Sequence, residues 1–209
     1  MINLHYRAKE KIGVWIKRMD KEVLNALPLF KLGAPIKIVD TLPGLQAALI
    51  EIYANYDVVG IDTESKPAWI RGVKHDIALI QIATQGTVYL IRTNIIGFPE
   101  ILWDFLVDTE ILKVGIGLKD DKQRLRRRRE DFNPDAWLDL SEVAKSGGII
   151  TIGLRNLVGL FLNKRLSKKQ QLSNWERYKL TPAQQHYAAL DAWAPLVIFW
   201  TIKAELQII

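Results

Sequence analysis

The chain has 209 residues, of which 49% are hydrophobic and 25% charged, an ordinary composition for a globular protein with a substantial core. It contains no cysteine, which excludes a disulfide scaffold, a thiolate metal site and a cysteine nucleophile. The formal net charge of +6 favours a polyanionic partner, nucleic acid first. The charge is clustered, because residues 113–131 carry eight Lys and Arg against four Asp and Glu, and residues 163–179 carry six against one.

No stretch approaches the ~18 apolar residues of a membrane-spanning helix, so no membrane partner is expected. Met1–Glu10 has neither the apolar core nor the small-residue cleavage site of a secretory signal. Together with the absence of cysteine, these features predict a cytoplasmic protein.

Residues 1–34 are predicted to form a basic helical appendage, followed by one compact domain over residues 35–205. An apolar stripe at helical spacing defines the appendage: Ile12, Trp15, Ile16, Met19 and Val23. Such a helix can bind a membrane surface or a partner, but the preferred interpretation is that its stripe packs on the following domain. Asp20 is a candidate cap of a second short helix that ends before Pro28.

The rest of the chain alternates strands and helices. Apolar runs predict strands at 36–39, 58–62, 77–84, 88–91 and 112–114, with a hairpin turn at Gln85-Gly86. Helical spacing predicts helices at 42–53, 99–107, 120–129, 138–145, 152–162 and 181–202. Asp40 or Thr41 is a candidate cap of the first helix, and Pro195 is expected to kink or interrupt the last. This order predicts an α/β sheet layered with helices.

Two carboxylates, Asp62 and Glu64, stand at the end of the strand 58–62. Alternate residues of a strand share a face, so these two side chains lie together. Carboxylates held side by side repel each other, and more so when buried, so either one is protonated or a cation lies between them. For an isolated Asp-x-Glu, a strand end fraying into a polar turn is the commoner explanation. The metal hypothesis therefore depends on further carboxylates downstream.

Asp120 and Asp121 open the helix that follows the strand 112–114. A helix N-terminus favours negative charge, so both can simply cap it; alternatively, one of them reaches the sheet edge as a third ligand. The glycines of the preceding turn do not complete a dinucleotide-binding motif, so a nucleotide cofactor is not expected. Arg124 and 126–129 are interpreted as a patch that contacts phosphates rather than bases.

The last helix presents two further candidates. Thr181-Pro182-Ala183-Gln184 is a capping box, so the helix begins before His186. Tyr187 and Asp191 are four residues apart and share a face, whereas His186 points roughly 140° away from Asp191. Asp191 is either a solvated helix position or a ligand, and its apolar neighbours argue against the first because an unpaired carboxylate among them is costly.

These segments resemble the motifs of the 3′–5′ exonuclease domains of the ribonuclease D and Werner-helicase type. The matching segments occur in family order over about residues 36–203: 59–64 with 78–82, 113–117 through Asp121 and Leu125, and 172–175 with 180–181 and 187–192. The resemblance implies a ribonuclease-H-like mixed β-sheet flanked by α-helices. It also implies two divalent cations, Mg²⁺ or Mn²⁺, held by Asp62, Glu64, Asp121 and Asp191, with Tyr187 orienting the attacking water.

The implied function is hydrolysis of phosphodiester bonds at DNA or RNA 3′ ends with release of nucleoside monophosphates. The alternatives are a catalytically silent nucleic-acid-binding module and a phosphodiesterase for short oligonucleotides. No obligate protein partner is expected. The third ligand is Asp120 or Asp121, and the distance to Leu125 favours Asp121. His186 occupies the place of a histidine used by a sister branch, but the capping box favours Tyr187.

Contacts to nucleic acid are expected from the loop after Glu64 and from the two basic clusters. The candidates are Trp69, Arg71, Lys119, Lys122, Arg126, Lys168, Lys169, Asn174 and Trp175. An aromatic ring and several cations beside a metal site suit a stacked base and its phosphates. The alternative for Trp69 is a half-buried side chain in an ordinary surface loop.

Overall fold

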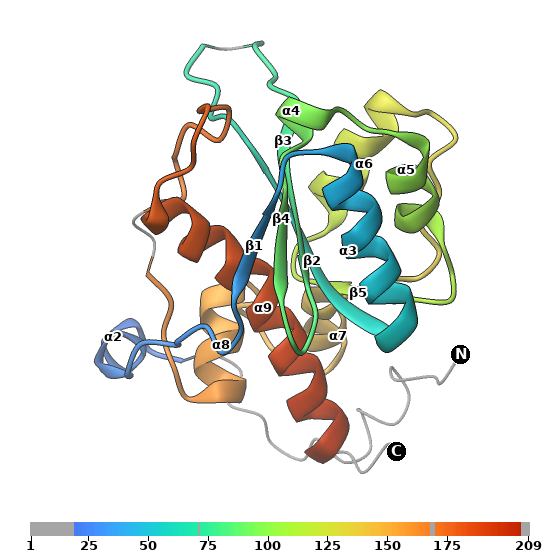
Figure 1. Ribbon diagram of the computed structural model, residues 1–209. Coiled ribbons are helices and arrows are strands. Elements are labelled where there is room, and N and C mark those ends of the chain that lie inside the picture. Colours follow the sequence, from blue (N-terminus) through green and yellow to red (C-terminus); the bar gives the residue numbers. More distant parts are fainter. Residues whose placement is uncertain (1–18, 71, 168–169, 206–209) are drawn as a thin grey trace.

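The computed structural model describes residues 19–70, 72–167 and 170–205 (Figure 1). The strands are β1 (Ile36–Val39), β2 (Val58–Ser65), β3 (Ile77–Ala83), β4 (Val88–Ile91), β5 (Leu112–Gly115) and β6 (Trp137–Asp139). The helices are α2 (Lys21–Ala26), α3 (Leu42–Asn55), α4 (Thr93–Ile96), α5 (Glu100–Val107), α6 (Lys119–Arg128), α7 (Leu140–Ser146), α8 (Leu154–Leu162) and α9 (Pro182–Glu205). No helix among these residues is long and apolar enough to cross a membrane.

The six strands form one mixed sheet in the order β1-β4-β3-β2-β5-β6. β2, β3 and β4 pair antiparallel, whereas β1 pairs parallel with β4, and β5 with β2 and β6. The predicted sheet flanked by helices is therefore confirmed. Helices α3, α5 and α6 cover one face, and α8 and α9 cover the other (Figure 1).

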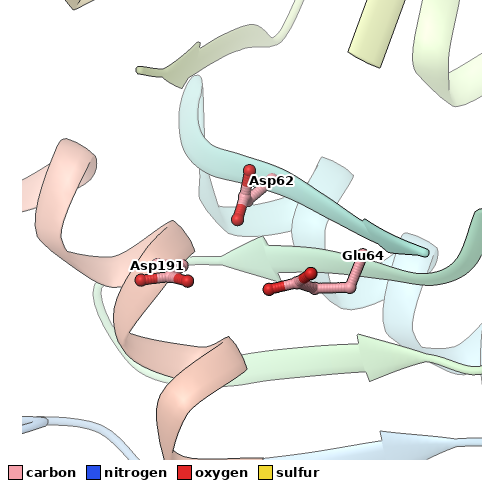
Figure 2. Close-up of side chains that lie close together, drawn as sticks. All are labelled: Asp62, Glu64 and Asp191. Atoms are coloured by element: carbon pink, nitrogen blue, oxygen red, sulfur yellow. The ribbon is translucent and has the colours of Figure 1, made fainter. Parts of the chain in front are cut away.

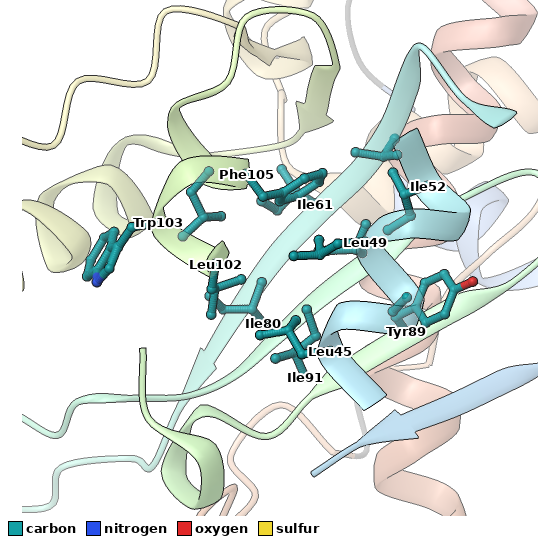
Figure 3. Close-up of a cluster of buried hydrophobic side chains, with 14 of the residues drawn as sticks. Leu45, Leu49, Ile52, Ile61, Ile80, Tyr89, Ile91, Leu102, Trp103 and Phe105 are labelled. Atoms are coloured by element: carbon teal, nitrogen blue, oxygen red, sulfur yellow. The ribbon is translucent and has the colours of Figure 1, made fainter. Parts of the chain in front are cut away.

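Each face of the sheet has its own apolar core. On the first face, alternate residues of β2, β3 and β4 meet α3 and α5, as shown by Ile61, Ile80 and Leu49 in Figure 3. On the second face, β3 and β4 pack against small side chains of α9 such as Ala188 and Ala192. Because successive side chains of a strand point to opposite faces of the sheet, every second residue of these strands faces α9.

Gly60 sets how closely α9 approaches β2. A side chain at this position would collide with the backbone carbonyl of Ala192 in α9. Because glycine lacks that side chain, the helix backbone lies directly on the strand two residues before Asp62. The close approach brings Asp191, the neighbour of Ala192, to the carboxylate end of β2.

Several local predictions are confirmed. Thr41 caps α3, where its hydroxyl accepts a hydrogen bond from the backbone N–H of Gly44 at 3.2 Å. The capping box of α9 is present, with the amide of Gln184 donating to the Thr181 hydroxyl and the Gln184 side chain accepting from the Thr181 amide. Asp20 stands at the N-cap of α2, but its side chain makes no capping hydrogen bond.

Three predictions are corrected. Residues 138–139 belong to β6 rather than to a helix, because pairing with β5 holds them extended. α9 continues through Pro195 without interruption, since packing on β2, β3 and α8 supports both of its halves. β2 extends to Ser65 and pairs with β3 along the way, so Asp62 and Glu64 lie within a strand and not in a frayed end. The stripe predicted at residues 12–23 lies mostly outside the described residues.

Candidate active site

Three carboxylates from two elements converge beside the sheet. Asp62 and Glu64 leave the same face of β2, and Asp191 faces them from α9 (Figure 2). One oxygen from each of the three carboxylates lies within 4.8 Å of the others. This spacing lets a single metal ion contact all three side chains.

Asp121 approaches from the opposite face of the sheet. It lies in the first turn of α6, is 8% exposed, and accepts a hydrogen bond from the hydroxyl of Thr63. Thr63 points away from Asp62 and Glu64 because it occupies the alternate position of β2. Asp120 is exposed. Of the two acidic residues, Asp121 is therefore the one buried against the carboxylate strand.

Burial raises the pKa of all four carboxylates, and for Asp62 and Glu64 the charges of the neighbouring carboxylates raise it further. For Asp62, burial is the main cause of a pKa well above its usual range, and the charges of Asp121, Asp191 and Glu64 add to it. Burial and the charges of Asp191 and Asp121 raise the pKa of Glu64 to about 9, although Arg124 opposes this. Burial raises the pKa of Asp191 to about 7, although the nearby phenol of Tyr187 opposes this. Without a cation, the group is too crowded to be fully ionised at neutral pH.

We expect the metal-free protein to lose stability as the pH rises from 5 to 8. Glu64 and Asp191 have folded-state pKa values above their ordinary 4.5 and 3.8, so the folded chain holds more protons than the unfolded chain in this range. Their contribution to the free energy of unfolding is full below the ordinary pKa values and is lost as the pH rises through the raised ones. The loss is at most ~1.4 kcal/mol per pH unit for each group. Urea unfolding midpoints in the presence of a chelator measure this, and Glu64→Gln should flatten the slope. A midpoint that rises over this interval would contradict the prediction.

Tyr187 lies one turn before Asp191 on the same face of α9. Its phenol lies close enough to the Asp191 carboxylate that each changes the pKa of the other. Burial, followed by the charges of Asp191 and Glu64, raises the pKa of Tyr187, so the phenol keeps its proton at neutral pH. His186 is exposed and does not line the cleft that Tyr187 borders. The helical-phase argument for Tyr187 over His186 agrees with this placement.

The carboxylates lie in a cleft of about 660 Å³ with cationic walls. Lys66, Lys74 and His75 line it from the loop after β2, and Arg124 and Arg127 line it from α6. The guanidinium of Arg124 donates to the Ser65 hydroxyl at 3.2 Å, which holds it beside Glu64. An acidic floor with basic walls suits a metal ion together with a phosphate-bearing ligand.

Glu176 ties together the two segments that border the cleft. Its carboxylate lies 3.4 Å from the amine of Lys66 and 3.4 Å from Nδ1 of His75. The guanidinium of Arg92 donates to the backbone carbonyls of Arg177 and Tyr178. The loop after β2 and the segment before α9 are thereby held against each other.

Comparison with known proteins gives the same assignment as the motifs. Residues 36–207 match the family model described as 3′–5′ exonuclease. The chain belongs to the 3′–5′ exonuclease family. Members of this family are hydrolases that act on nucleic acids, and the resemblance to the ribonuclease D and Werner-helicase type is confirmed.

Relatives of this exonuclease domain occur in animals and plants. The mouse bifunctional 3′–5′ exonuclease/ATP-dependent helicase WRN is 34% identical over 149 residues, which are 68% of this chain and 11% of that protein. An Arabidopsis thaliana 3′–5′ exonuclease is 34% identical over 152 residues, which are 69% of this chain and 52% of that protein. The chain thus spans 11% and 52% of these two curated relatives.

Solved structures confirm the ribonuclease-H-like fold of the exonuclease domain. The crystal structure of the Aedes aegypti Nibbler EXO domain aligns with a TM-score of 0.73 at 26% identity, covering 87% of this chain and 92% of that one. Escherichia coli RNase D aligns with a TM-score of 0.72 at 22% identity, covering 83% of this chain and 45% of that one.

The predicted nucleic-acid contacts have different outcomes within the exonuclease domain. Trp69, 77% exposed, and Asn174 are at the surface, so both stay predictions. Trp175 is a correction, because its side chain is completely buried against Tyr187, with ring centroids 6.1 Å apart, and presents no surface to a nucleic acid. Arg71, Lys168 and Lys169 lie outside the described residues.

The predicted nucleic-acid contacts on α6 also differ in their surroundings. Lys119 is exposed. Lys122 donates to the backbone carbonyl of Trp137 at 3.3 Å, and Arg126 donates to that of Phe132 at 3.2 Å. None of these three lines the cleft, so Arg124 and Arg127 are the members of the arginine patch that do.

Sequence reasoning gave no role to two features next to the carboxylates. Gln81 on β3 belongs to the matching segment 78–82, stands opposite Asp62 and is fully buried; its signal is a single polar residue in the apolar strand 77–83. The other feature is a second cavity of about 480 Å³, bordered by Lys21 and Leu24 of α2 and reaching Tyr187 and Asp191. No sequence pattern predicts that a segment before the domain borders the site.

Proposed function

We propose that this chain is a two-metal-ion 3′–5′ exonuclease that hydrolyses the terminal phosphodiester bond of DNA or RNA and releases nucleoside monophosphates. The observation that carries the proposal is the convergence of Asp62, Glu64 and Asp191, with oxygens within 4.8 Å, at the floor of a cationic cleft. The family membership supplies the polarity of attack.

The donor set fits Mg²⁺ or Mn²⁺. All three converging side chains offer carboxylate oxygens, the ligands that hard divalent cations prefer. Burial, and after it the charges of the neighbouring carboxylates, raises the pKa values of Asp62 and Glu64, and bound positive charge would favour their ionised forms. Asp121 is a candidate fourth ligand, since its charge acts on both Asp62 and Glu64.

The protein groups around the carboxylates have distinct roles in this proposal. Asp62, Glu64 and Asp191 would hold the divalent cations, which when bound would supply a nucleophilic water at neutral pH and stabilise charge on the phosphoryl oxygens. Tyr187 orients that water through its phenol and does not take its proton, because the pKa of the phenol is raised. Arg124 and Arg127 bind substrate phosphates from the cleft wall. Trp69, exposed in the loop after β2, stacks on an unpaired base.

Digestion of 5′-labelled single-stranded DNA and RNA tests the proposal. With Mg²⁺ or Mn²⁺ the expected result is a ladder of products that shorten one nucleotide at a time from the 3′ end, and EDTA should stop it. Fragments of random length would indicate internal cleavage and contradict the assignment. Comparing DNA with RNA in the same assay identifies the preferred sugar.

Two alternatives give different results in that assay. A catalytically silent binding module would retard the labelled strand in a gel but leave its length unchanged with either metal. A phosphodiesterase for short oligonucleotides would cleave dinucleotides as fast as long strands. The exonuclease proposal expects the long strand to be favoured at low salt, because the basic walls contact several phosphates.

Asp121 and Asp120 form a matched pair for testing the third ligand. We expect Asp121→Asn to lower the rate of nucleotide release at least ~10-fold, because removing a ligand or its hydrogen-bonded support weakens metal binding. Asp120→Asn removes the same charge from an exposed position and should leave the rate near that of the wild type. The measurement is initial rate against Mg²⁺ concentration. A larger loss of rate for Asp120→Asn than for Asp121→Asn would identify Asp120 as the ligand instead.

A further inference from the structure

Gln81 is the cross-strand neighbour of Asp62. The register of β2 and β3 places the two residues directly opposite each other, so their side chains leave the same face of the sheet. Facing Cβ atoms in an antiparallel pair are about 4.5–5.5 Å apart, which is within reach of a glutamine amide. Ile80 and Ile82 on either side of Gln81 pack on the opposite face, which confirms that Gln81 points toward α9.

The amide of Gln81 is buried without a hydrogen bond. The side chain is 0% exposed, and neither Nε2 nor Oε1 finds a partner among the residues that the structure describes. Leaving a buried polar group unsatisfied costs about 1–3 kcal/mol. An apolar side chain of the same length would fill this position without that cost, so stability does not account for a glutamine.

Within the sheet, Asp62 is the polar neighbour of the Gln81 amide. The same-face neighbours of Gln81 are Leu79 and Ala83 on β3 and Leu90, which pairs with it on β4. Across β2, its direct partner is Asp62. Within the sheet, the Gln81 amide therefore has three apolar side chains and the Asp62 carboxylate as neighbours, and only the carboxylate can accept from its N–H.

Trp175 is a second candidate hydrogen-bond partner of Gln81, but only for the oxygen of its amide. Its indole Nε1 is also buried without a partner among the described residues and belongs to the same apolar cluster. The indole is a donor only, so it can satisfy Oε1 of Gln81 but not Nε2. The donor of Gln81 therefore stays available to Asp62 in either case.

We propose that Gln81 is a positioning residue: its Nε2, which has no partner among the described residues, is the donor that holds the Asp62 carboxylate in orientation when a divalent cation is bound. This inference rests on the proposed function, because it assumes that Asp62 is a ligand. Ligating carboxylates are themselves held by hydrogen bonds, and loss of such a partner typically weakens metal affinity about 10–100-fold. Gln81 touches neither the ion nor the substrate in this role.

Calorimetric titration of Mn²⁺ into the purified chain, without nucleic acid, tests the role of Gln81. Gln81→Met keeps the length of the side chain and removes the amide, and Gln81→Leu is a second apolar variant. For both, we expect Mn²⁺ affinity to fall about 10–100-fold. The thermal midpoint of the metal-free protein should stay equal or rise, because an unsatisfied amide is removed. Trp175→Phe, which removes the indole donor, should keep the wild-type Mn²⁺ affinity.

The outcomes separate this inference from the proposed function. Wild-type affinity in both Gln81 variants would overturn the positioning role while leaving the metal site intact. Weaker binding together with a lower metal-free midpoint would show a structural role and also overturn it. Absence of Mn²⁺ binding in the wild-type chain would instead overturn the proposed function, and the inference with it.

Discussion

Asp62→Asn should lower the rate of 3′-terminal nucleotide release by about a thousand-fold or more, because metal ions contribute several kcal/mol of transition-state stabilisation. Asp62 is the carboxylate that all the others act on: the charges of Asp121, Asp191 and Glu64 each raise its pKa. An amide of the same shape keeps the packing but removes the charged ligand. Initial rates on a labelled single strand at saturating Mg²⁺ measure the effect.

The stability of the same variant supplies the control. Because Asp62 is buried and repelled by its neighbours, replacing it with a neutral amide should stabilise the metal-free protein. A gain on the order of 1 kcal/mol corresponds to a rise of ~2–4 °C in the thermal midpoint for a chain of this size. Lost activity with a lowered midpoint would indicate misfolding, and retained activity would exclude Asp62 from the metal site.

Tyr187→Phe is the second large effect. We expect turnover to fall about 100-fold, because small displacements of a reacting group have costs of this size. Mn²⁺ affinity should be preserved, since Tyr187 is not one of the converging carboxylates. Turnover and Mn²⁺ titration, measured on the same preparation, separate the two effects.

His186→Ala is the matched control for Tyr187. His186 is adjacent in sequence, exposed, and on another face of α9, so its removal should leave turnover near the wild-type value. A larger loss for His186→Ala than for Tyr187→Phe would place the protein in the histidine branch of the family.

Patterns local to one element predict this fold well. Periodicity and caps locate most strands and helices. The capping box together with helical spacing predicts that Tyr187, and not His186, shares the face of Asp191, and Tyr187 does line the cleft with Asp191. The boundary at residues 138–139 is wrong because a short parallel strand is stabilised by its neighbour, β5, which is distant in sequence. Likewise, Pro195 does not interrupt α9, because tertiary packing overrides its local cost.

The candidate site shows where sequence reasoning ends. Spacing and family motifs identify Asp62, Glu64 and Asp191, and the structure brings these three together. The burial of Trp175 and the partner of Asp62 in β3 depend on register and helix packing, which no single motif encodes. The contribution of α2 to a second cavity is likewise a tertiary contact.

One measurement tests the central proposal most directly: the first products released from a single-stranded oligonucleotide labelled at its 3′-terminal nucleotide, with Mg²⁺, using wild-type protein and Asp62→Asn. The wild-type chain should convert the label to a nucleoside monophosphate from the earliest time point. Asp62→Asn should release the labelled nucleotide at least about a thousand-fold more slowly. Labelled fragments of several nucleotides, or equal release by Asp62→Asn, would contradict a 3′–5′ exonuclease built on these carboxylates.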